Sequence, residues 1–197
     1  MSTLKATYLQ HPSASSANVT LASDGKATFN GAMVGAGLDL ITTSTFSTVS
    51  SVSINNCFSS TYENYRIIVT GTNTVENLIL MRLRGSSTDA AGSDYGTQSV
   101  NINSTTVSVD AVTSQTNLRG GVFSTAFGGF TLDIYSPQLA QPTSFFAQSV
   151  NFVSGGTPRF LSYTSRHGLS TAYDGFSLIP ASGTMTGTLR VYGYRNS

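Results

Sequence analysis

The chain has 197 residues, a net charge of +1 and only 10% charged residues. It therefore lacks both the high net charge of a disordered chain and the clustered lysines and arginines of a nucleic-acid-binding protein. Cys57 is the single cysteine, which excludes an intrachain disulfide and a zinc cluster, and its apolar neighbours Ile54 and Phe58 predict a buried thiol. No run of 18 apolar residues and no apolar segment near the start occurs, so we expect neither a membrane span nor a secretion signal.

The first region of the chain, residues 1–37, is polar and holds short extended segments with little apolar surface. Strands are predicted at residues 7–10, 17–22 and 26–31. Asp24 and Gly25 predict a hairpin turn between the last two, because glycine tolerates a positive φ. The glycines of residues 31–37 predict a hinge. We call residues 1–37 the N-terminal arm.

The arm has too few apolar side chains to form a core of its own, since a lone small hairpin is only marginally stable in water. Extended backbone must still pair its N–H and C=O groups, and other chains are the simplest source of partners. We therefore expect the arm to serve anchoring and oligomerisation. The residues expected to do so are Tyr8, Leu9, His11, Pro12, Val19, Leu21 and Phe29.

The second region, residues 38–197, contains many short β-type runs separated by Ser, Thr, Gly and Asn clusters. Strands are predicted at 38–46, 48–56, 65–72, 77–85, 95–103, 105–112, 128–137, 144–154, 159–166, 176–181 and 187–195. Phe130, Leu132 and Ile134 alternate with polar residues, which predicts one buried strand face. The pattern indicates an all-β fold, an antiparallel β-sandwich of the jelly-roll type, with its last two strands paired as a closing hairpin.

Catalytic and metal-binding patterns are not apparent in the sequence. His11 and His167 stand alone, and His167 is expected in a surface loop. Asp89 and Asp94 are close in the sequence but do not match a calcium loop, and no nucleophile or phosphate-binding motif occurs. We expect no catalytic residues, no metal and no cofactor, and therefore no enzyme.

Tyrosines from the late strands and loops suggest a contact surface, because tyrosine combines a rigid apolar ring with a polar tip. The candidate contacts to a glycan or protein partner are Tyr163, His167, Tyr173, Tyr192 and Tyr194. The same tyrosines also suit a subunit interface or a cap over the sheet. Both interpretations stay open at the level of sequence.

The segment YLQHPSASSANVTLASDGKATF of the arm resembles a segment that recurs in tail-fibre and other virion proteins of tailed bacteriophages. FSTVSSVSINNCFSSTYENYRIIVTG and GTLRVYGYRN, near the start and end of the second region, are similar to jelly-roll domains of virion surface proteins. The resemblance implies a trimer-forming β-sandwich with an N-terminal attachment arm and no shared catalytic residues. It also implies a virion location after assembly in the host cytoplasm.

These patterns together lead to the expectation of a structural virion protein, a short trimeric fibre that binds other virion proteins through its arm and contacts a host-surface glycan. One alternative is a capsid decoration protein that stabilises the head. A second alternative is a carbohydrate-binding module or depolymerase. We expect no nucleic-acid partner and no membrane insertion.

Overall fold

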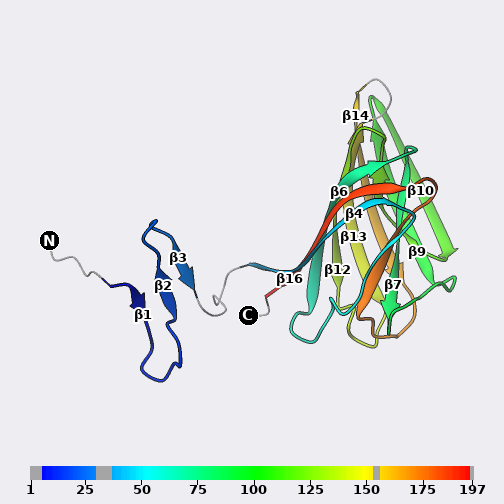
Figure 1. The fold of residues 1–197 in the computed structure, drawn as a ribbon. Helices are drawn as coiled ribbons and strands as arrows, with labels where there is room; N and C mark the ends of the chain where they lie inside the picture. The colour runs from blue at the N-terminus through cyan, green and yellow to red at the C-terminus, as the bar shows by residue number, and fades with distance from the viewer. Residues whose placement is uncertain (1–5, 30–36, 153–155, 196–197) are drawn as a thin grey trace. The chain divides into compact units, whose positions relative to one another are not determined.

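The computed structural model describes residues 6–29, 37–152 and 156–195, and within these ranges every regular element is a β-strand (Figure 1). The chain divides into two compact units, one formed by the residues up to Ala36 and the other by Gly37–Asn196. The predicted hinge at 31–37 lies outside the described residues except for Gly37.

The first unit is a three-stranded antiparallel sheet. Its strands, in spatial order, are β1 (Tyr8–Leu9), β2 (Val19–Leu21) and β3 (Ala27–Phe29). The turn between β2 and β3 has Gly25 at φ +84°, and the carboxylate of Asp24 accepts a hydrogen bond from the Lys26 backbone N–H at 3.1 Å. None of residues 6–29 is buried, so this sheet has no core of its own.

The second unit contains two sheets. The larger one, which we call the large sheet, has eight antiparallel strands in the order β10 (Thr106–Gln115), β9 (Tyr95–Asn103), β14 (Pro158–His167), β13 (Thr143–Phe152), β12 (Gly128–Tyr135), β6 (Asn64–Asn73), β16 (Met185–Tyr194) and β4 (Leu38–Val49). The small sheet has the order β11 (Leu118–Phe123), β7 (Asn77–Gly85), β15 (Gly175–Pro180) and β5 (Val52–Ile54), with β8 (Thr88–Asp89) paired to the end of β7.

The core lies between the two sheets and is built from alternating residues of their strands. Phe130, Leu132 and Ile134 of β12 are buried, as predicted, and Ile79, Met81 and Leu83 supply the facing residues of β7. Leu189 and Val191 of β16 are fully buried. Cys57 is also buried, and its burial raises the pKa of the thiol to about 12, which suits the predicted inert apolar role.

The prediction of an all-β antiparallel sandwich is confirmed, whereas the specific jelly-roll connectivity stays a prediction. The predicted closing hairpin is wrong. Strand β15 pairs with β5 and β7 in the small sheet, while β16 pairs with β4 and β6 in the large sheet. The chain therefore crosses from one sheet to the other between Pro180 and Met185, so that the apolar faces of both strands reach the same core.

Strand β11 was absent from the predicted set because its LRGGVF sequence contains adjacent glycines. In the structure the ring of Phe130 packs directly on this glycine backbone. A Cβ atom added at Gly121 would lie 2.5 Å from Cδ1 of Phe130, and Phe130 is itself buried. Glycine in a strand interior here marks close approach by a neighbouring side chain.

Candidate functional site

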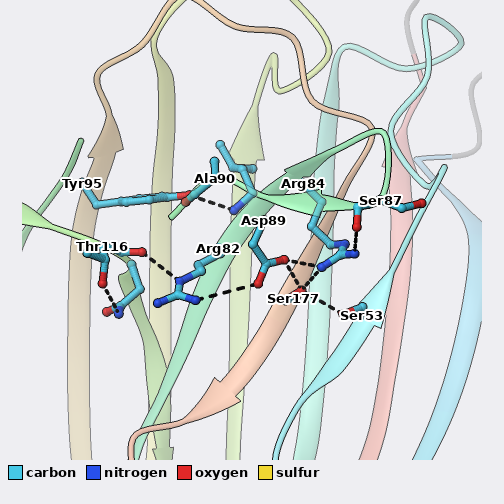
Figure 2. Close-up of polar contacts among 11 residues, drawn as sticks. Ser53, Arg82, Arg84, Ser87, Asp89, Ala90, Tyr95, Thr116 and Ser177 are labelled. Carbon is cyan, nitrogen blue, oxygen red and sulfur yellow. Dashed lines mark hydrogen bonds and ion pairs between the residues drawn. The ribbon is translucent and has the colours of Figure 1, made fainter. Parts of the chain in front are cut away.

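A network of polar side chains covers the outer face of the small sheet, as Figure 2 shows. Its two arginines, Arg82 and Arg84, alternate along β7 with buried apolar residues. The two-residue turn at Ser86 and Ser87, both with positive φ, folds β8 back along β7 and sets Asp89 directly opposite Arg84. The turn therefore brings a carboxylate onto the face that carries the two guanidinium groups.

Arg84 is the centre of this network. Its guanidinium donates to the carboxylate of Asp89 and to the carbonyl of Ser87, and to the hydroxyl of Ser177 at 2.9 Å. The Ser177 hydroxyl donates in turn to Oδ1 of Asp89 at 2.7 Å (Figure 2). Arg82 donates through Nε to the carbonyl of Thr116 at 3.0 Å, and its guanidinium lies 3.9 Å from the Asp89 carboxylate.

This network joins strands β7, β8 and β15, and it is structural in character. Ser177 is buried at 1% exposure, and its hydroxyl is bonded to a carboxylate that is shared with two arginines. A carboxylate held in this way is a poor general base, and within the described network no histidine stands beside the serine. Arg82 and Arg84 both form intramolecular ion pairs with Asp89.

Three of the five predicted contact residues are buried, so they do not form an exposed contact surface. Tyr163, His167 and Tyr173 have exposed fractions of 2%, 0% and 6%. His167 ends β14 instead of lying in a surface loop, and its ring packs between Tyr95 and Tyr173 with centroids 4.5 and 5.2 Å away. This burial lowers the pKa of His167. This burial was not predictable from the residues next to His167, because Arg166 and Gly168 are typical of an exposed loop.

The other two tyrosines of that set, Tyr192 and Tyr194, are half-buried. The hydroxyl of Tyr194 donates to Oδ1 of Asp133 at 2.8 Å, and the same carboxylate accepts two hydrogen bonds from Arg66. Burial, together with the bond to Asp133, raises the pKa of Tyr194 to about 12. Tyr194 therefore serves an internal network, and Tyr192 keeps the predicted contact role as a prediction.

The predicted anchoring residues of the arm lie on the surface of the first unit. Tyr8, Leu9, Leu21 and Phe29 are between 41% and 58% exposed. His11 and Pro12 lie in the exposed turn between β1 and β2, and Val19 pairs with Phe29 across the β2–β3 ladder. None of these residues packs into a core, and their anchoring role stays a prediction.

A second exposed apolar surface lies on the outer face of the large sheet and was not predicted. Its residues are between 38% and 78% exposed, and we call them the outer patch: Val100, Ile102, Val107, Val109, Phe127, Val150, Phe152 and Phe160. Val107, Ile102, Phe160 and Val150 are successive partners across four adjacent strands, so they form one row. Beside this row, Gly129 leaves a groove of about 390 Å³.

Strand β10 forms the edge of the large sheet next to the outer patch. All of its residues are exposed except Val112, which is half-buried. Both faces of the strand and its outer backbone edge are therefore uncovered. Long uncovered edges of this kind are usually protected in monomers, because they pair readily with other chains. The valines of 105–112 predicted a strand correctly, but alternation alone does not reveal that neither face is covered.

Within the described residues, no three His, Cys, Asp or Glu side chains lie together in a way that could hold a metal ion. In the same part of the chain there is no helix with the length and apolar character that crossing a membrane requires. Comparison with protein-family models, with curated proteins and with solved structures finds no match to this chain.

Proposed function

We propose that the chain is a non-enzymatic structural protein of a tailed-bacteriophage virion, a short trimeric fibre that exposes a β-sandwich for attachment to the host surface. The N-terminal arm would bind other virion proteins. The observation that carries the proposal is the lack of a core in the arm: residues 6–29 form three strands, yet none of their side chains is buried. Such a sheet gains stability by packing against another polypeptide.

The outer patch supports self-association of the second unit. Monomeric proteins rarely expose a continuous apolar surface of many large side chains. The residues interleaved with the patch on the same face, such as Gln148 and Ser162, are uncharged. With a net charge of +1, copies of the chain repel one another little. A second copy of this chain is therefore the occupant we assign to the patch and to the edge of β10.

The oligomer is tested by measuring the mass of the purified full chain in solution by light scattering. We expect three times the chain mass of 20.7 kDa. Val109→Lys places a charge on a side chain that is 78% exposed, so it should release monomers without affecting the fold. Val75→Lys is the matched control, because Val75 is 50% exposed but lies outside the patch. A monomeric full chain, or equal behaviour of both variants, would contradict self-association through the patch.

The arm is tested by deletion of residues 1–31 from a tagged copy that is supplied during phage assembly. We expect the truncated chain to fold, with unchanged unfolding of the second unit, and to be absent from purified particles. Removal of residues 1–5 alone, before β1, is the control and should leave incorporation intact. Normal incorporation of the larger deletion would refute the anchoring role.

The head-decoration alternative shares the arm and the patch, so neither observation favours it over the fibre. Copy number on the purified particle separates the two assignments. A fibre is present in few copies, whereas a decoration protein covers the head in many.

A further inference from the structure

A polar cavity of about 350 Å³ opens between the edge strand β11 of the small sheet and the strands β9, β10 and β14 of the large sheet. The large sheet has more strands than the small one, so the inward face of β9 and β10 extends past the cover that β11 provides. Ser99, Asn101, Ser108 and Asp110 line the cavity from this face. The inward face of the large sheet is therefore polar at this edge, where Ser108 and Asp110 are exposed, whereas the other strands bury their inward face in the apolar core.

Two ion pairs fix the charge of the cavity. Arg119 of β11 reaches across to Asp110 of β10 at 2.7 Å, and Arg159 of β14 pairs with Glu76 at 2.9 Å. Nε of Arg159 also donates to Oδ1 of Asn151 at 3.0 Å, which holds the guanidinium in place. Each arginine is matched by one carboxylate, so the lining has no net charge. A ligand that brings a charge of its own would have to break one of these pairs.

Two polar atoms in the lining have no partner within the protein. The hydroxyl of Tyr163, a residue only 2% exposed, and Oδ1 of Asn101 are both buried without a hydrogen bond. Leaving a buried polar group unpaired is costly, and most such groups in folded proteins are satisfied by protein, ligand or ordered water. Oδ1 of Asn101 accepts a hydrogen bond, and the hydroxyl of Tyr163 can donate or accept one, so a ligand hydroxyl, which does both, can pair with either atom.

Apolar side chains complete the lining. Leu78, Val122 and Leu161 lie beside the polar residues, and cavities of this size accept small organic ligands. From these features we infer that the cavity binds a neutral saccharide of one or two sugar rings. Sugar hydroxyls both donate and accept, which matches Asn101, Tyr163 and the paired arginines. The apolar face of a sugar ring matches the leucines. The proposed attachment function is needed only to say that the sugar comes from the host surface; the binding of a sugar is inferred from the cavity itself.

The site is tested on the isolated full-length protein by saturation-transfer-difference NMR and calorimetric titration. The probes are glucose, galactose, mannose and N-acetylglucosamine with their disaccharides, and glucuronate serves as the charged comparison. We expect at least one neutral sugar to bind and glucuronate to bind more weakly. Tyr163→Phe removes only the unpartnered hydroxyl, so it should retain the unfolding midpoint and weaken binding by about tenfold, the value of one hydrogen bond.

Tyr135→Phe is the matched control, because it removes a hydroxyl from a tyrosine that is 43% exposed on the outer face of the large sheet. It should bind the sugar like the unaltered chain. The inference is overturned if no neutral sugar of the panel binds, if glucuronate binds best, or if both tyrosine variants bind equally well. Because sugar binding is measured on the isolated protein and incorporation on the particle, failure of one result leaves the other standing.

Discussion

Substitution of Gly121 by alanine tests whether β11 is held in the sandwich by close packing of an aromatic ring on bare backbone. The added Cβ would lie 2.5 Å from Cδ1 and 2.8 Å from Cγ of Phe130. Optimal carbon–carbon contacts are about 3.5–4.0 Å, so the ring must move by roughly 1 Å. Phe130 is 4% exposed and packs against Phe123 at a centroid distance of 5.9 Å, which leaves the ring little space to move.

The expected cost follows from two opposing effects. Overpacking a core costs about 1–3 kcal/mol, whereas replacing glycine by alanine restricts the unfolded chain and returns about 0.4–1 kcal/mol. We therefore expect Gly121→Ala to lower the free energy of unfolding by about 1–2 kcal/mol. For a unit of this size that lowers the melting temperature by roughly 2–8 °C.

The measurement is thermal and urea unfolding of the full chain, followed by circular dichroism. Gly96→Ala is the control, because a Cβ at Gly96 would meet only the Val112 carbonyl oxygen at 3.5 Å, an ordinary contact. That variant should be neutral or more stable by up to about 1 kcal/mol. If Gly121→Ala melts at or above the temperature of Gly96→Ala, the proposed packing of the Phe130 ring on β11 is incorrect.

Two further predictions concern polar groups of the second unit. Asp89→Asn removes the charge opposite Arg84, whose side chain is 12% exposed, and should lower the free energy of unfolding in urea by about 1–3 kcal/mol. The control is Asp110→Asn, at a carboxylate that is 55% exposed, which should lower it by at most about 1 kcal/mol. Equal losses for the two variants would contradict the structural role of the network. Burial lowers the pKa of His167 below its ordinary 6.5. Below pH 6.5 the unfolded chain therefore binds a proton at His167 that the folded chain does not. The free energy of unfolding should then fall as the pH drops below 6.5, by up to about 1.4 kcal/mol per pH unit. His167→Gln should flatten this dependence between pH 7 and 5, and an unchanged slope would exclude His167 as its source.

The fold class was predictable because strand alternation is a local signal. Phe130, Leu132 and Ile134 mark a buried face within five residues of sequence, and the structure places all three in the core. Strand β11 was missed because its glycines are normally turn residues, and their role depends on an aromatic ring that comes from another strand. Pairing between sheets is also non-local, which is why the apparent hairpin of β15 and β16 was wrong.

The candidate sites were harder to predict than the fold. Tyr163 was singled out for its polar tip, but it lies inside the sandwich and is one of the residues that line the cavity. Arg119 and Arg159 stand singly in the sequence and meet Asp110 and Glu76 only through the arrangement of the sheets. Which strand faces remain uncovered depends on the widths of the two sheets, and no single segment encodes that difference.

The unequal width of the two sheets affects how substitutions could change which ligand the cavity binds. The cavity is bordered largely by strand residues, and the backbone ladders hold these in place before any ligand arrives. Little conformational closure is then required, so affinity would be governed by side-chain chemistry more than by loop ordering. Changes at Ser99 and Asn101 of β9 or at Ser108 and Asp110 of β10 would adjust the choice of ligand, because none of these residues belongs to the apolar core.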